Sequence, residues 1–233
     1  MQQAYQALRV ISQAQTVRIV LATRPGELML TELRAACAAL QEKSSDGIKA
    51  VILDFAEQTS YTEEDRSGKA ETLAAARAAL RAIPQPVLMV VRASLSAAAC
   101  SFLTEADFTL IAHEAELCLP ISHGGDDNRI GGIVAARLGY ATWSASAADL
   151  NREMERVLNM LRAKSALALR HAKASVRLLS TTNADTPTDE ASAQLEALRQ
   201  INQFYLANVT TTQDAREGLQ AFLEKRPPRW QNS

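Results

Sequence analysis

The chain has 233 residues, with 25 lysines and arginines against 26 aspartates and glutamates and a formal net charge of −1. This length allows a sizeable buried core, and the balanced charge excludes the basic excess typical of proteins that bind nucleic acid or anionic membranes. Three cysteines without CxxC spacing argue against a disulfide scaffold and a structural zinc site, so we expect no metal.

The N-terminal half alternates between strand-like and helix-like segments. Residues 1–15 lack the basic start and apolar core of a signal peptide, and the cysteine pattern suits a reducing setting, so we expect a cytoplasmic protein. The β-branched run 17–22 predicts a strand that ends at a turn containing Pro25 and Gly26. Apolar residues at helical spacing predict a helix over 27–41. Further strands are predicted over 49–55, 87–91 and 107–112, and further helices over 70–82 and from residue 97.

The last third of the chain is helical in character. From about residue 147 to 207 no stretch has a strand pattern, and a polar break at 180–190 divides the helical segments. Thr211 and Asp214 have the spacing of a capping box, which predicts the start of a last helix. Strands alternating with helices predict an α/β fold. We therefore expect an α/β body over 1–145 and a helical C-terminal module over 146–233.

Three stretches are similar to motifs of one family. Residues 85–120 run from a strand beginning Pro-Val through a turn and a helix to Asp107 and Pro120, and residues 214–230 read DAREGLQAFLEKRPPRW. Together with VRIVLATRP at 17–25, they resemble the crotonase superfamily, the enoyl-CoA hydratase/isomerase family. The resemblance implies a crotonase-type spiral of ββα units whose C-terminal helical module mediates trimers, often paired into hexamers.

The resemblance also implies a ligand and an oxyanion hole. Family members bind acyl-CoA thioesters as substrates, without a further cofactor, and stabilise an enolate-like oxyanion with two backbone N–H groups. Here these positions fall at Thr62 and Ala98. Relatives carry three glycines where this chain has Ala97–Ala99, and Glu63 replaces the glycine of the other turn. Alanine retains its N–H, but its β-carbon narrows the approach of the thioester. The alternative is a helix start that binds nothing.

The candidate catalytic groups differ from those of a hydratase. The two hydratase glutamates fall at Ser101 and Ile121, so two-glutamate hydration is not expected, and a serine would need its own base. His123, Asp126 and Asp127 are the clustered acid/base groups that remain after Pro120, and a His–Asp pair could act as a general base. The same polar loop is also typical of a surface turn.

Substrate-binding candidates follow from position in the family fold. Ala97 would lie beside the thioester, and Arg24 and Lys225 would meet the CoA phosphates. The alternative for both cations is an ordinary exposed side chain.

Two functions remain open. The first is a lyase or isomerase of the enoyl-CoA hydratase/isomerase family that acts on an acyl-CoA thioester by oxyanion-hole enolate stabilisation. The second is a catalytically inactive crotonase homologue, a pseudoenzyme, that serves as a structural or regulatory subunit beside an active partner. Two missing glutamates, two turns without glycine and a short stretch after Tyr140 favour the second. Expected partners are an acyl-CoA, further copies in a trimer or hexamer, or an active crotonase, with no nucleic acid and no membrane.

Overall fold

The computed structural model describes residues 5–13, 15–42, 47–56, 69–119, 129–182 and 190–232. The chain divides into two compact units, Met1–Met160 and Leu161–Ser233. This division lies later in the chain than the predicted boundary after residue 145. None of the described helices is long and apolar enough to cross a membrane.

The first unit is built on a six-stranded sheet. Its strands, in their order across the sheet, are β1 (Arg9–Gln13), β2 (Thr16–Ala22), β3 (Ala50–Ala56), β4 (Val87–Val91), β5 (Phe108–Ala112) and β8 (Trp143–Ala145). β1 runs antiparallel to β2, whereas every other neighbouring pair is parallel. The central strands β3 and β4 are apolar and buried almost throughout, as parallel strands covered on both faces should be.

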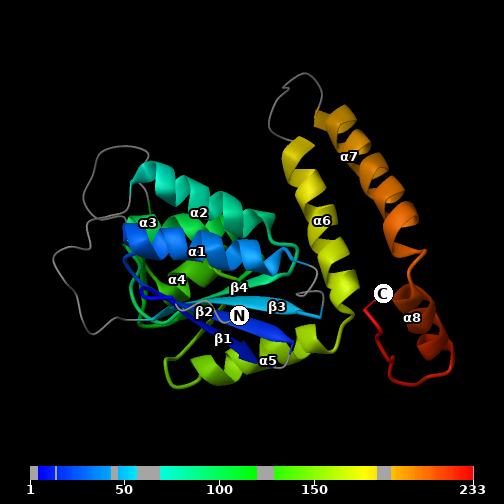
Figure 1. Cartoon of the computed structure of the whole chain (residues 1–233), viewed down its shortest axis with the longest axis horizontal. Coiled ribbons are helices and arrows are strands. Elements are labelled where there is room, and N and C mark those ends of the chain that lie inside the picture. Colours follow the sequence, from blue (N-terminus) through cyan, green and yellow to red (C-terminus); the bar gives the residue numbers. More distant parts are fainter. Residues whose placement is uncertain are drawn as a thin grey trace. The chain divides into compact units, whose positions relative to one another are not determined.

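Helices cover both faces of this sheet. Figure 1 shows α1 (Glu27–Leu40) and α2 (Ala70–Ala82) on one side and α5 (Leu150–Arg162) on the other. The predicted α/β architecture is therefore confirmed. The unit also contains α3 (Ala97–Cys100), the 3-10 helix η2 (Ser101–Glu105), α4 (Gly132–Arg137), and an antiparallel pair of short strands, β6 (Glu116–Cys118) and β7 (Arg129–Gly131).

The Glu27 side chain of α1 fixes the start of α2. Lys69, the residue before α2, offers no side-chain cap. Instead the carboxylate of Glu27 accepts a hydrogen bond from the Lys69 N–H at 2.8 Å and another from the Thr72 hydroxyl. A carboxylate at this position satisfies the free N–H of the N-cap residue Lys69 and complements the helix dipole. The first turns of α1 and α2 are thereby held together.

The second unit is helical, as the sequence predicts. It contains α6 (Ala166–Thr182), α7 (Glu190–Phe204), the π-helix η3 (Tyr205–Val209) and α8 (Gln213–Leu223). The predicted polar break falls largely on residues 183–189, which lie outside the described residues.

The predicted capping box of the last helix is wrong by one residue. Thr212, and not Thr211, caps α8, because its hydroxyl oxygen accepts a hydrogen bond from the Ala215 N–H at 3.1 Å. The Thr211 hydroxyl donates instead to the Ala207 carbonyl at 3.2 Å. Asp214 is therefore not the reciprocal member of a capping box. Its buried carboxylate accepts the N–H groups of residues 231 and 232, at 2.7 and 3.0 Å, and so holds the C-terminal tail against α8.

A second carboxylate of α8 also binds this tail. Glu217 accepts hydrogen bonds from the Arg226 guanidinium at 2.6 and 3.0 Å and from the Arg229 N–H at 2.6 Å. The hydrogen bonds from Arg226 and from the Arg229 backbone lower the pKa of Glu217 to about 2. The ionised form of Glu217 is therefore favoured in the folded state.

This pKa predicts an acid-sensitive contribution to stability. Glutamate in an unfolded chain has a pKa of about 4.3, so Glu217 contributes stability that is fully present above that pH and lost as the pH falls towards 2. We expect Glu217→Gln to lower the thermal midpoint at pH 7, and the difference from the wild type to vanish near pH 2. The measurement is thermal unfolding from pH 7 to pH 2. Glu196→Gln, which removes an exposed carboxylate 3.8 Å from Arg199, is the control and should show no such trend. A Glu217→Gln difference that is constant with pH contradicts this account.

Candidate functional site

Part of the predicted site lies outside the described residues. Thr62, the first predicted oxyanion donor, is in the stretch 57–68, and His123, Asp126 and Asp127 are in the stretch 120–128. The described part of the site is the turn between β4 and α3, with the predicted residues Ala97, Ala98 and Ser101.

Two neighbouring segments hold this turn in place. Ser96 is the N-cap of α3: its hydroxyl oxygen accepts a hydrogen bond from the Ala99 N–H at 3.3 Å. The Ser96 hydroxyl and N–H both donate to the Thr23 carbonyl at the end of β2, at 3.1 and 3.2 Å. On the other side, the Leu95 N–H donates to the Glu116 carbonyl in β6 at 2.8 Å. The turn therefore has a fixed backbone between the ends of two strands.

The three alanines occupy the first turn of α3. Ala97 is exposed, Ala98 is half-buried and Ala99 is fully buried. The first N–H groups of a helix have no partner within the helix, and here the Ser96 cap takes that of Ala99. No group among the described residues accepts a hydrogen bond from the Ala98 N–H. Ala98 thus presents a backbone donor at the carboxyl end of a buried parallel strand.

Ser101 takes part in a local backbone hydrogen bond. Its hydroxyl donates to the Ala98 carbonyl at 2.7 Å, and its carbonyl accepts a hydrogen bond from the Thr104 hydroxyl at 3.2 Å. A nucleophilic or proton-transferring serine needs a base that accepts its proton. Within the described part of the chain, no imidazole or carboxylate accepts from Ser101.

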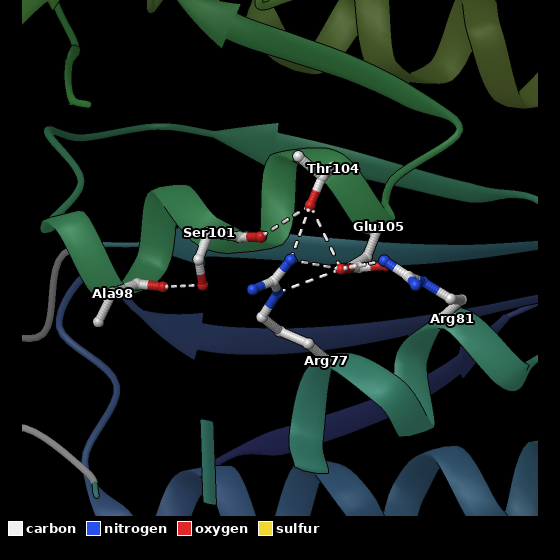
Figure 2. Close-up of polar contacts among 6 residues, drawn as sticks. All are labelled: Arg77, Arg81, Ala98, Ser101, Thr104 and Glu105. Atoms are coloured by element: carbon white, nitrogen blue, oxygen red, sulfur yellow. Dashed lines mark hydrogen bonds and ion pairs between the residues drawn. The ribbon is translucent and has the colours of Figure 1, made fainter. Parts of the chain in front are cut away.

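An ion cluster around the buried carboxylate of Glu105 links η2 to α2, and the sequence reasoning missed it. Figure 2 shows the carboxylate of Glu105, in η2, between Arg77 and Arg81 of α2. The Arg77 nitrogens lie 2.8 and 3.1 Å from this carboxylate, and the Arg81 nitrogens lie 2.7 and 3.0 Å from it. The Glu105 side chain is 1% exposed. Burial alone would raise the pKa of Glu105, but the hydrogen bonds from Arg81 and Arg77 outweigh it and the pKa lies below its usual range.

A second buried carboxylate lies within the sheet. Asp54, in β3, is fully buried and pairs with Arg18 of β2 and with Arg92, which follows β4. The Arg92 Nε lies 2.7 Å from one oxygen of Asp54, and the Arg18 Nε lies 2.7 Å from the other. This cluster joins three neighbouring strands and gives Arg92 a structural partner that the sequence did not reveal.

The two predicted phosphate-binding cations are both exposed. Arg24 lies in the turn after β2 in the first unit. Lys225 lies in the second unit directly after α8, where its φ of 54° and its N–H donation to the Phe222 carbonyl at 3.2 Å form the left-handed end of that helix. Their role towards CoA phosphates stays a prediction.

Among known proteins, solved structures share this architecture, whereas family models and curated proteins give no match. Solved structures match along nearly the whole chain. An enoyl-CoA hydratase from Mycobacterium smegmatis is 20% identical with a TM-score of 0.75, and the match covers 97% of this chain and 99% of the other. An enoyl-CoA hydratase/isomerase from Mycobacterium paratuberculosis is 19% identical with a TM-score of 0.76, covering 99% and 100%.

A third structure gives the same result. An enoyl-CoA hydratase from Polaromonas sp. JS666 is 21% identical with a TM-score of 0.76, and the match covers 97% of this chain and 100% of the other. At this level of identity the likeness establishes the fold. The chain therefore has the crotonase-type fold that the sequence motifs predict.

Proposed function

We propose that this chain is a divergent member of the enoyl-CoA hydratase/isomerase family and binds an acyl-CoA thioester at the turn between β4 and α3. The observation that carries the proposal is the Ala98 N–H, which has no acceptor among the described residues and follows a buried parallel strand. Ligands of α/β sheets bind outside the carboxyl ends of the strands. The near full-length likeness to structures of enoyl-CoA hydratases supports the choice of ligand.

In this proposal the thioester oxygen accepts a hydrogen bond from the Ala98 N–H, beside Ala97. Thr62 supplies the second donor, as the sequence resemblance implies. Removal of a proton from the carbon next to the thioester carbonyl places negative charge on that oxygen. Each donor that is preorganised to meet this charge stabilises the transition state by about 2.7–4 kcal/mol. His123 and Asp127, with Asp126 beside them, are the candidates that accept the proton. Arg24 and Lys225 are the candidate partners of the CoA phosphates.

The second candidate function is that of a non-catalytic subunit. The Ser101 hydroxyl, at the position of a hydratase glutamate, is committed to the Ala98 carbonyl, which favours loss of hydration chemistry. The second unit also exposes large apolar side chains on α7, η3 and α8, and such surfaces are typical of oligomer interfaces. They suit a trimer or hexamer of this chain or assembly with an active crotonase. These side chains are Leu195, Leu198, Tyr205, Leu206, Leu219, Phe222 and Leu223.

A calorimetric titration tests the ligand. The probes are crotonyl-CoA, free CoA and a thioether analogue, S-butyl-CoA, which lacks the thioester carbonyl. We expect crotonyl-CoA to bind at least about tenfold more tightly than the thioether, because only the thioester accepts hydrogen bonds from the turn. Equal binding of the two contradicts the oxyanion site, and absence of binding by all three contradicts an acyl-CoA ligand.

Two further measurements distinguish the enzyme from the subunit. Exchange of an α-proton of a saturated thioester, butyryl-CoA, for deuterium, followed by NMR, reports enolate formation, and its loss in His123→Ala or Asp127→Asn would identify the base. Binding without exchange in the wild type favours the subunit. Purification from the native source then shows whether an active crotonase accompanies the chain.

Ala98→Val is expected to weaken crotonyl-CoA binding about tenfold, because two added methyl groups stand beside the donor N–H. Free CoA should bind as in the wild type, since its contacts lie elsewhere. Ala78→Val, at an exposed position of α2, carries the same change in helix propensity and is the control. Unchanged crotonyl-CoA affinity in Ala98→Val contradicts the role of this turn.

A further inference from the structure

The Glu105 cluster connects the α3 turn to helix α2. Glu105 is the last residue of η2, which continues directly from α3, whereas Arg77 and Arg81 are one turn apart on α2. Ala98 lies in the first turn of α3, and Glu105 joins this helical segment to α2.

A chain of hydrogen bonds extends from this cluster to the carbonyl of Ala98, the residue whose N–H is the proposed donor. The Ser101 hydroxyl donates to the Ala98 carbonyl at 2.7 Å, and the Thr104 hydroxyl donates to the Ser101 carbonyl at 3.2 Å. Arg77 completes the chain, because its Nη2 donates to the Thr104 hydroxyl at 3.1 Å and to the Glu105 carboxylate at 2.8 Å. Figure 2 shows the series running along one side of α3 and η2 towards α2.

The chemistry of the cluster favours precise placement over stability. Burying the Glu105 carboxylate costs desolvation, and its pairing with arginine side chains that are 34% and 63% exposed adds little net stability. The cluster instead fixes positions, because a carboxylate held by two guanidinium groups accepts hydrogen bonds only in a narrow geometry. Both oxygens of Glu105 are used: Oε1 by Arg77 and Arg81, and Oε2 by Arg81. The position of η2 along α2 is thereby fixed.

We propose that Glu105 is a positioning residue for the Ala98 amide. By holding η2 and α3 in register with α2, it aims the Ala98 N–H at the thioester oxygen. Donors of an oxyanion hole must be held to within about 0.5 Å of their working positions. This inference rests on the proposed function, because it assumes that the Ala98 N–H meets a thioester.

The test uses a ligand whose spectrum reports the hydrogen bonds to its carbonyl. Cinnamoyl-CoA absorbs at longer wavelength when its carbonyl is polarised, so its absorbance maximum at saturation measures donor alignment independently of the amount bound. We expect Glu105→Gln to reduce this red shift and to weaken cinnamoyl-CoA binding about tenfold, while S-butyl-CoA binds within about twofold of wild type. Glu105→Asp, which keeps a carboxylate for one guanidinium, should retain part of the shift.

A matched control separates positioning from stability. Glu32 of α1 is another carboxylate that accepts several hydrogen bonds, from the N–H groups of residues 6, 7 and 8 at 2.7–3.2 Å. Glu32→Gln should lower the thermal midpoint and leave the red shift unchanged. Arg77→Gln is a second variant of the cluster for the case in which Glu105→Gln does not fold, and it should give an intermediate shift because Arg81 still pairs with Glu105.

The outcomes are distinct. If the cluster variants lower the thermal midpoint but keep the wild-type red shift and the wild-type ratio of thioester to thioether affinity, Glu105 is only structural and the inference is overturned. If wild-type protein binds cinnamoyl-CoA with no red shift, or binds neither cinnamoyl-CoA nor crotonyl-CoA, the proposed function fails and the inference fails with it.

Discussion

Gly132→Ala is expected to lower the free energy of unfolding of the first unit by about 3 kcal/mol, at the upper end of the usual cost of overpacking. A β-carbon at residue 132 would lie 2.1 Å from the carbonyl oxygen of Ala112 and 3.0 Å from its carbonyl carbon. Both are backbone atoms at the end of β5, so no side-chain rotation relieves the contact.

Two backbone interactions hold these segments in place. The Gly132 N–H donates to the Ala115 carbonyl at 2.9 Å, and Ala112 pairs with Ala145 of β8 in the sheet. Displacing either segment by the required distance breaks one of these interactions. The cost therefore includes a lost hydrogen bond as well as the steric contact.

The neighbouring glycine provides the control. A β-carbon at Gly131 would meet nothing within 4 Å, and its φ of −69° suits any residue. Gly131→Ala should change the free energy of unfolding by no more than about 0.5 kcal/mol. Urea unfolding followed by circular dichroism measures both variants. Equal midpoints for the two would contradict the close approach of α4 to β5.

Asp54→Asn is expected to lower the free energy of unfolding by about 3 kcal/mol, the lower end of the range for breaking a buried ion pair. The substitution keeps the shape of the side chain but leaves Arg18 and Arg92 facing each other without a counter-charge. Their side chains remain 28% and 21% exposed, so water relieves part of the repulsion. For this reason we place the cost at the lower end.

Two further variants show whether the lower stability of Asp54→Asn comes from the buried charge. Glu116→Gln breaks the exposed pair with Arg129, whose atoms are 3.5 Å apart, and should cost no more than about 0.5 kcal/mol. The triple variant Asp54→Leu, Arg18→Met and Arg92→Met replaces the whole cluster by apolar side chains and should recover most of the stability. A loss in Asp54→Asn as small as that in Glu116→Gln would show that the cluster is not effectively buried.

The central sheet could be predicted from the sequence, whereas its edges could not. The β-branched and apolar runs at 17–22, 49–55 and 87–91 predict β2, β3 and β4 to within a residue, because strands buried on both faces read as continuous apolar segments. β1 was missed because its residues are exposed or half-buried and carry no such pattern. β8 was missed because it has only three residues.

The interactions around the site depend on contacts between distant residues. Glu105 pairs with arginines 24 and 28 residues earlier, and Asp54 pairs with arginines 36 and 38 residues away. Asp54 is the one charged residue of the apolar run 51–56, which indicates a buried partner, but the sequence does not say which cation supplies it. The strand-to-helix turn before α3 is predictable because its motif is local, whereas the role of Ala98 as an oxyanion donor stays a prediction.

The order of the sheet also bears on how the chain folds during synthesis. The strands lie across the sheet in the order in which the ribosome makes them, from β1 to β5 and then β8. Each new strand can therefore join the edge formed by the previous one, without inserting between strands that are already paired. Asp54 leaves the ribosome between its two partners, after Arg18 and before Arg92. The growing chain thus carries a carboxylate with one counter-charge until β4 is complete, and the joining of β4 brings both the next strand and the missing cation.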